Sequence, residues 1–289
     1  MLDYHAVRDR GPDESVYRYA ERETMLYALG IGIGADPGDV GQLSFVYERN
    51  LQVVPTMAAA LGHPGPMWRE PQIGADWARV VHGEEDLRLF KPLPARGAIR
   101  VRNSVVSLTD KGPEKGAVAA ILRELVDEGS GELIARGRSV AFLRGDGGFS
   151  RTGGASDPPP EPLAPVPGRA ADTEVTLASL PQAGLIYRLF GDDNPLHADP
   201  DAARAAGFPR PILHGLCTYG MAAHALLRCC CGYDASRLGR IAVRFAAAVY
   251  PGDILRFELW RETGMTVHFR AHVDARRAIV LDRGVAEIR

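Results

Sequence analysis

Alternating apolar and polar residues mark the end of each half of the chain as β-structure. Val267, Phe269, Ala271 and Val273 share one face, the pattern of an antiparallel strand with one buried side. Similar patterns predict strands near 99–108, 117–126 and 132–144 and, later, near 254–261, 265–273 and 278–288. We therefore expect antiparallel sheet in both halves.

A run of small residues between 215 and 227 has helical spacing. It contains Gly220, Ala222 and Ala223, and Gly232 follows it as a stop signal. Small side chains let a helix lie close against a curved sheet. The sequence thus predicts an α+β unit in which a sheet wraps around one central helix.

Glycine and proline dominate the segment between the two halves, which includes the run DPPPEP at 157–162. Prolines at this density cannot occupy a helix or a central strand, so the segment is expected to be an extended connector. We predict a first unit at 1–144, a connector at 145–172 and a second unit at 173–289.

The two halves repeat the same order of local patterns. The repeated patterns are 26–30 with 186–191, 57–61 with 221–225, 93–97 with 249–253 and 136–137 with 283–284. Matches that keep their order along the chain indicate a duplicated domain.

Composition narrows the function classes. Lys and Arg number 34 and Asp and Glu 36, a net charge of −2, so bulk charge does not direct the chain to nucleic acid or an anionic membrane. No apolar run approaches the roughly 20 residues of a membrane span, and the first residues lack the apolar stretch of a signal peptide. We expect a soluble, cytoplasmic protein.

The four cysteines, Cys217 and those at 229–231, have the spacing of neither a disulfide framework nor a zinc site. We expect buried or half-buried thiols in a reducing compartment.

Candidate chemistry is concentrated in one loop. The sequence GDDNP predicts a turn at 191–195, so Asp192, Asn194 and His197 lie close together, and Gly215 starts the small-residue helix. A carboxylate beside an imidazole can move protons near neutral pH. Asn194 is placed to orient a substrate or a water, and the N–H of Gly215 favours developing negative charge.

Two other interpretations of these residues stay open. In one, Asp192 and Asn194 only stabilise the turn and His197 caps a helix. In the other, Asp192, His197, Asp199 and His214 bind a metal, although no pair among them has a familiar ligand spacing.

The stretch YRLFGDDNPLHADP at 187–200, with PILHGL at 211–216, resembles the signature of MaoC-like dehydratases. More narrowly it resembles R-specific 2-enoyl-CoA hydratases of the hydratase-2 type, including that part of the peroxisomal multifunctional enzyme. Further matches cover nearly the whole chain: 45–48, 55–56, 82–84, 91–94, 244–245 and 250–253.

The resemblance implies a double hotdog fold, in which two sheets wrap two helices and only the second half is catalytic. The first half has glycines at 30, 32 and 34 where the motif would stand. The resemblance further implies that the degenerate half leaves room for long or bulky acyl chains. The resemblance assigns catalysis to Asp192 and His197, assisted by Asn194, and the thioester oxyanion to the Gly215 N–H.

The implied reaction adds water to trans-2-enoyl-CoA and yields a (3R)-3-hydroxyacyl-CoA. CoA enters as part of the acyl-CoA substrate, so neither a separate cofactor nor a metal is expected. Arg210, Lys91 and Arg244 are candidates to contact the CoA phosphates, and we expect a homodimer. Two alternatives stay open, a hotdog acyl-CoA thioesterase and a non-catalytic acyl-CoA-binding module or structural subunit.

Overall fold

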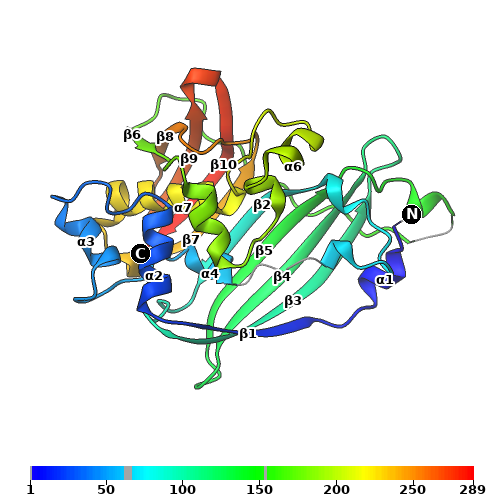
Figure 1. Cartoon of the computed structure of the whole chain (residues 1–289), viewed down its shortest axis with the longest axis horizontal. Helices are drawn as coiled ribbons and strands as arrows, with labels where there is room; N and C mark the ends of the chain where they lie inside the picture. The colour runs from blue at the N-terminus through cyan, green and yellow to red at the C-terminus, as the bar shows by residue number, and fades with distance from the viewer. Residues whose placement is uncertain (1, 62–66, 153–154) are drawn as a thin grey trace.

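The computed structural model describes residues 2–61, 67–152 and 155–289, and its strands form one antiparallel sheet (Figure 1). The strand order is β1-β3-β4-β5-β2-β7-β10-β9-β8-β6. The strands are β1 (Asp13–Tyr19), β2 (Val80–Leu89), β3 (Gly97–Asp110), β4 (Ala117–Asp127), β5 (Leu133–Leu143), β6 (Thr173–Ala178), β7 (Leu238–Phe245), β8 (Ile254–Arg261), β9 (Thr266–Val273) and β10 (Ala278–Ile288).

Both halves of the sheet have the same strand order. From its outer edge the first half runs β1-β3-β4-β5-β2, and the second runs β6-β8-β9-β10-β7. The halves join where β2 pairs with β7, with Glu84 opposite Arg244 and Arg88 opposite Arg240. The duplicated α+β architecture predicted from the sequence is therefore confirmed.

Short helices accompany the sheet, and α2, α4 and α7 lie over one of its faces (Figure 1). None of the described helices has the length and apolar character needed to cross a bilayer. The α-helices are α1 (Tyr4–Arg8), α2 (Glu21–Gly30), α3 (Val40–Val46), α4 (Met57–Leu61), α5 (Ala183–Tyr187), α6 (Pro200–Ala205) and α7 (Gly215–Leu226).

The central helix α7 needs its small residues. Every residue after Gly215 in this helix is buried, and α4 of the first half packs against it. A β-carbon on Gly220 would lie only 2.6 Å from the Ile31 side chain, so glycine alone lets the two segments meet this closely. The helix continues as one π-helical turn to Cys231 and stops at Gly232, whose φ is +59°.

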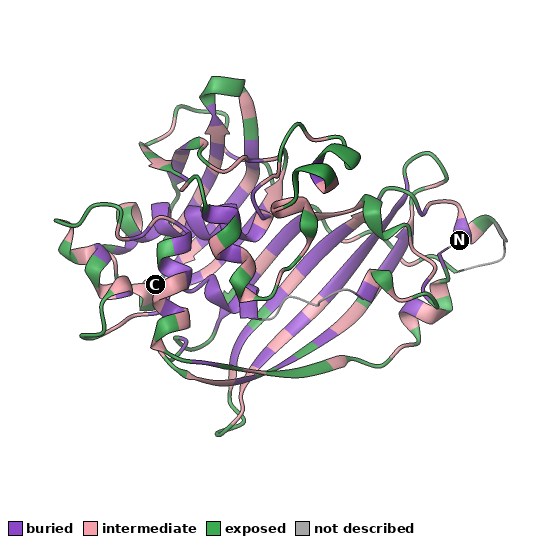
Figure 2. Ribbon diagram, viewed as in Figure 1, coloured by how far each residue is buried: buried purple, intermediate pink, exposed green. Residues whose placement is uncertain are grey.

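One apolar core spans both halves, and a smaller cluster fills the far end of β3, β4 and β5. Figure 2 shows the buried residues running through the central helices and the middle of the sheet. Cys217 and Cys231 are buried, while Cys229 and Cys230 are half-buried, and all four are free thiols. Burial raises the pKa of Cys231 to about 12. The expectation of buried and half-buried thiols is confirmed.

The Pro-rich segment lies on the surface but is anchored to the sheet. No helix or strand occurs in its described part between 155 and 172. Leu163 and Val166 are nevertheless buried, and the Leu163 carbonyl accepts a hydrogen bond of 2.7 Å from Arg283. The Trp260 indole donates to the Arg169 carbonyl at 2.8 Å. The segment is therefore exposed only in part, because the buried side chains of Leu163 and Val166 hold it against the rest of the protein.

Candidate active site

The loop that carries the predicted residues is fixed by its own turns. Gly191 has a φ of +104°, a conformation that glycine adopts without strain, and it ends the helical turn before Asp192. The Asn194 side-chain oxygen accepts from the Leu196 N–H at 3.1 Å and caps the short 3₁₀ turn η5 (Pro195–His197). The Asp192 side chain in turn accepts from the Asn194 N–H at 3.3 Å. The turn-stabilising roles expected for Asp192 and Asn194 therefore exist.

His197 is held in one orientation by the backbone. Its Nδ1 lies 2.9 Å from the Ile212 carbonyl oxygen. A carbonyl oxygen only accepts hydrogen bonds, so Nδ1 carries the proton and Nε2 keeps its lone pair. Burial lowers the pKa of His197, and the nearby charge of Asp192 opposes that shift. The neutral ring can therefore accept a proton at Nε2.

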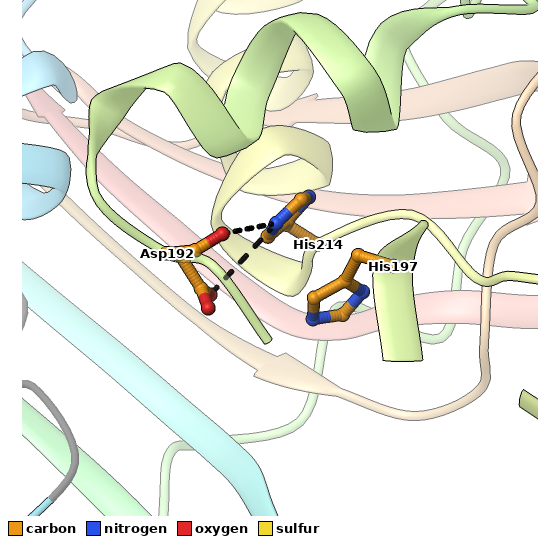
Figure 3. A group of neighbouring side chains, drawn as sticks. All are labelled: Asp192, His197 and His214. Atoms are coloured by element: carbon orange, nitrogen blue, oxygen red, sulfur yellow. Dashed lines mark hydrogen bonds and ion pairs between the residues drawn. The ribbon is translucent and has the colours of Figure 1, made fainter. Parts of the chain in front are cut away.

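Asp192, His197 and His214 form one cluster, with their ligand atoms within 4.8 Å of one another (Figure 3). The His214 ring is 1% exposed, and its Nε2 lies 3.2 Å from the Asp192 carbonyl oxygen and 4.0 Å from Oδ2. The rings of His197 and His214 stack with their centroids 3.8 Å apart. The Tyr187 ring packs next to His214, with the two ring centroids 4.9 Å apart.

His214 is the residue of this cluster whose supporting role the sequence does not predict. The sequence presents it only as a possible metal ligand and as the residue before the small-residue helix. The available signal was its position directly before Gly215, at the N-cap of α7. That position brings its side chain back to the loop, 22 residues earlier in the chain.

The cluster fits proton transfer better than metal binding. A metal binds in the plane of an imidazole ring, along the nitrogen lone pair. The rings of His197 and His214 stack at an interplanar angle of 30°, so their lone pairs run side by side and do not converge on one point. His214 Nε2 also faces a carbonyl oxygen and therefore carries a proton.

Gly215 is the first residue of α7, at the positive end of the helix dipole. Among the described residues, no backbone hydrogen bond is formed by its N–H. The Phe245 ring covers one side of the residue, and a β-carbon on Gly215 would lie 3.4 Å from it. His214 links Gly215 to Asp192, because it precedes Gly215 in the chain and its Nε2 contacts the Asp192 carbonyl oxygen.

The three candidate CoA-binding cations do not gather around this cluster. Lys91 forms an exposed ion pair with Glu132. Arg210 is exposed, donates to the Pro251 carbonyl at 3.1 Å and lies over the Tyr250 ring. Arg244 precedes Phe245 in β7, so it lies on the opposite face of the sheet from the residue that covers Gly215. Only Arg210 belongs to the segment leading into the cluster.

Comparison with known proteins identifies the family. The model for the MFE-2 hydratase 2 N-terminal domain matches residues 17–145, and the model for the MaoC like domain matches residues 162–282. An enoyl-CoA hydratase 2, peroxisomal, of Arabidopsis thaliana is 40% identical over 96% of this chain and 92% of its own length. The chain belongs to the MaoC-like dehydratase family. The chain is an enzyme of the hydro-lyase class.

Other relatives agree with this assignment. A 3-hydroxyacyl-thioester dehydratase Y of Mycobacterium tuberculosis is 38% identical over 94% of the chain and 93% of its own length. The crystal structure of a MaoC-like dehydratase from Phytophthora capsici superposes with a TM-score of 0.84 at 29% identity, covering 100% of this chain and 99% of that one. A Mycobacterium tuberculosis protein described as a double hotdog fold superposes with a TM-score of 0.56 over 96% of both chains. The predicted double hotdog fold is therefore confirmed.

Proposed function

We propose that this MaoC-like dehydratase hydrates trans-2-enoyl-CoA to (3R)-3-hydroxyacyl-CoA. The observation that carries the proposal is the orientation of His197. Its Nδ1–H is held by the Ile212 carbonyl, which leaves Nε2 beside Asp192 as a neutral proton acceptor. The names of the relatives, an enoyl-CoA hydratase 2 among them, support the same substrate class.

In the proposed mechanism, one water is added across the C2=C3 bond. Asp192 and His197 hold this water, and Nε2 of His197 takes a proton from it as its oxygen bonds to C3. The electrons of the double bond move toward the thioester oxygen. His197 then returns the proton to C2, which completes the 3-hydroxyacyl product and regenerates the neutral imidazole.

The Gly215 N–H is proposed to hold the thioester oxygen while negative charge develops there. A single donor of this kind stabilises a transition state by about 3–4 kcal/mol. Its position at the first residue of α7 adds the helix dipole, and its N–H is not used by the described backbone. Asn194 is proposed to assist by keeping Asp192 and His197 in one turn, because its side chain caps η5.

Several further features are proposals. Residues 1–144 and 173–289 are proposed as the two units, with 145–172 as the connector. Arg210 is proposed to contact the CoA phosphates, since it is exposed next to the segment that enters the cluster. We also propose a homodimer and a cytoplasmic location.

The alternatives make different chemical predictions. A thioesterase would attack C1 of the thioester and release free CoA, and a binding module would leave the substrate unchanged. The neighbouring side chains of Asp192 and His197 argue against a binding module, because a protein that only binds its substrate needs no groups that transfer protons.

One assay separates these functions. The purified protein is mixed with trans-2-enoyl-CoA esters of graded chain length, and loss of the enoyl-thioester absorbance and release of thiol are followed together. Loss of absorbance without thiol is the expected result. Thiol release would instead indicate a thioesterase, and no change with any ester would contradict both enzymes.

A further inference from the structure

A second histidine–carboxylate pair enters the core from the half that lacks the catalytic motif. His82 Nε2 lies 3.0 Å from Glu85 Oε2 and 3.1 Å from the Glu84 carbonyl oxygen. The carbonyl only accepts, so Nε2 carries the proton and donates it. The Glu85 side chain is fully buried, whereas the His82 side chain is 24% exposed. The pair therefore extends from the protein interior, at Glu85, to a partly exposed position, at His82.

A β-bulge gives His82 this direction. The pairing of β2 with β5 skips a residue between His82 and Glu84, and bulges of this kind redirect side chains. Gly83 lies inside the bulge, where a β-carbon would approach the Phe142 ring to 2.1 Å. Any larger residue would have to displace the Phe142 ring, so glycine suits this bulge.

Glu85 is held from behind by a buried arginine. Arg123 Nη1 lies 3.3 Å from Glu85 Oε1 and donates to the Ala59 carbonyl of α4 at 2.9 Å. The Arg123 side chain is 1% exposed, and its Nη2 has no hydrogen-bond partner among the described residues. A buried ion pair of this kind adds little stability over well-packed apolar residues. Its presence points to a role in fixing Glu85 and His82.

His82 contacts the active site through one aromatic ring. Its ring packs edge-on against Phe245, with centroids 4.8 Å apart. Phe245 in turn covers Gly215, at the first residue of α7. A continuous series of contacts therefore leads from the buried ion pair of the first half to the helix start of the second.

We propose that His82 is a positioning residue for the reaction. It fixes Phe245, and Phe245 fixes the start of α7, so that the Gly215 N–H is aimed at the thioester oxygen. This inference rests on the proposed hydratase function. It gives the half without the motif a part in turnover, beyond leaving room for an acyl chain.

The kinetic test compares two histidine–carboxylate pairs. His272 Nε2 lies 2.9 Å from Glu258 Oε2 on β9 and β8, outside the contacts just described, and His272→Leu is the matched control. We expect His82→Leu to lower kcat by about ten- to a hundredfold, because small misplacements of a reacting group have effects of this size. KM should stay within about threefold, since substrate binding elsewhere is untouched. A loss confined to KM, or one no larger than in the control, would overturn the proposal.

A double-mutant cycle tests the path through Phe245. The effects of His82→Leu and Phe245→Leu on kcat should be clearly non-additive, because both changes release the same contact. Additive effects would show that His82 does not act through Phe245.

The buried ion pair is tested by replacing Glu85 and Arg123 together by Leu. The double replacement leaves no unpaired buried charge, and the folded variant should also have a lower kcat. Unchanged kcat in this double variant would argue against the buried pair as the support of His82.

A readout independent of turnover separates this inference from the proposed function. The backbone amide resonance of Gly215 should shift in His82→Leu and stay in place in His272→Leu, because the Phe245 ring next to Gly215 changes position only in the first. An unmoved Gly215 amide in His82→Leu would refute the positioning role. A wild-type protein that hydrates none of the esters would refute the proposed function, whatever the resonance does.

Discussion

The imidazole rings of His197 and His214 stack with their centroids 3.8 Å apart, and only His197 belongs to the Asp-x-Asn-x-x-His motif. His214 comes from the start of the central helix and faces the backbone of Asp192. The loop at 191–197 is therefore supported directly by the helix that carries Gly215. A displacement of either segment would move both the proposed proton-transfer pair and the proposed oxyanion donor.

Removing either member of the proton-transfer pair should abolish most of the activity. Asp192→Asn and His197→Ala are each expected to lower kcat by at least about 10²-fold, because the first loses the carboxylate that holds the attacking water and the second loses the base that takes its proton. Asp192 and His197 are half-buried and lie outside the apolar core, so the melting temperature should change little. Rates of enoyl-CoA hydration and circular dichroism melts measure the two effects, and near-normal hydration by either variant would contradict the assignment.

His214 should matter through its polar contact as well as its ring. In His214→Phe an aromatic ring still packs on His197, but the hydrogen bond to the Asp192 carbonyl is lost. We expect kcat to fall by about tenfold, consistent with the loss of one orienting hydrogen bond. Steady-state kinetics test this. If His214→Phe and His214→Ala have the same kcat, the stacked ring contributes nothing to turnover.

Gly215 should tolerate alanine better than valine. A β-carbon would lie at ordinary contact distance, 3.4 Å, from Phe245, so Gly215→Ala should fold with kcat within a few-fold of wild type. The branched side chain of Gly215→Val must push Phe245 away and block the close approach of the thioester. We expect Gly215→Val to lose substrate binding and turnover, and Cys229→Ala, at the far end of the same helical segment, to keep kcat/KM within a few-fold. Equal activities of the Ala and Val variants would contradict this account.

Stability should fall in mild acid because of a buried histidine in α7. Burial lowers the pKa of His224 to about 4, from 6.5. The unfolded chain then takes up a proton that the folded chain resists, so the effect is absent above 6.5 and grows as the pH falls toward 4. At pH 5 it amounts to about 2 kcal/mol. Urea unfolding at pH 7.5 and pH 5 measures it.

His224→Leu is the control for this pH effect. The variant should lose about 2 kcal/mol less than wild type between the two pH values. Burial also lowers the pKa of His197, which acts in the same direction, so some pH dependence should persist in the variant. An unchanged pH dependence in His224→Leu would exclude His224 as its source.

The sequence predicts the parts of the fold that alternate cleanly. The six predicted strands correspond to β3, β4, β5, β8, β9 and β10. β2 and β7 are not among the predicted strands. Three consecutive acidic residues at 84–86 interrupt the alternation of β2, whereas Ile241, Val243 and Phe245 of β7 do alternate with polar or small residues. Asp86 of β2 is paired with Arg240 of β7 at 2.8 Å, and this partner lies 154 residues away in the chain. A pairing at that distance has no local signal. The edge strands β1 and β6 are not among the predicted strands either, because they are short and rich in polar residues.

The site was predictable in its local part only. Asp192, Asn194 and His197 lie within one turn, so sequence spacing alone brings them together. The stacking of His214 on His197 depends on where α7 begins relative to the loop. The contact of His82 with Phe245 depends on the pairing of the two halves and on a bulge at Gly83. Contacts of this kind follow from tertiary packing, which spacing does not encode.

The most direct test of the central claim follows the oxygen of water. The protein is incubated with crotonyl-CoA in ¹⁸O-labelled water, and the products are examined by mass spectrometry and chiral analysis. We predict ¹⁸O on C3 of (3R)-3-hydroxybutyryl-CoA, formed at least about 10²-fold more slowly by Asp192→Asn. Label in the carboxylate of a released acid, or on C3 of the 3S product, would contradict the account.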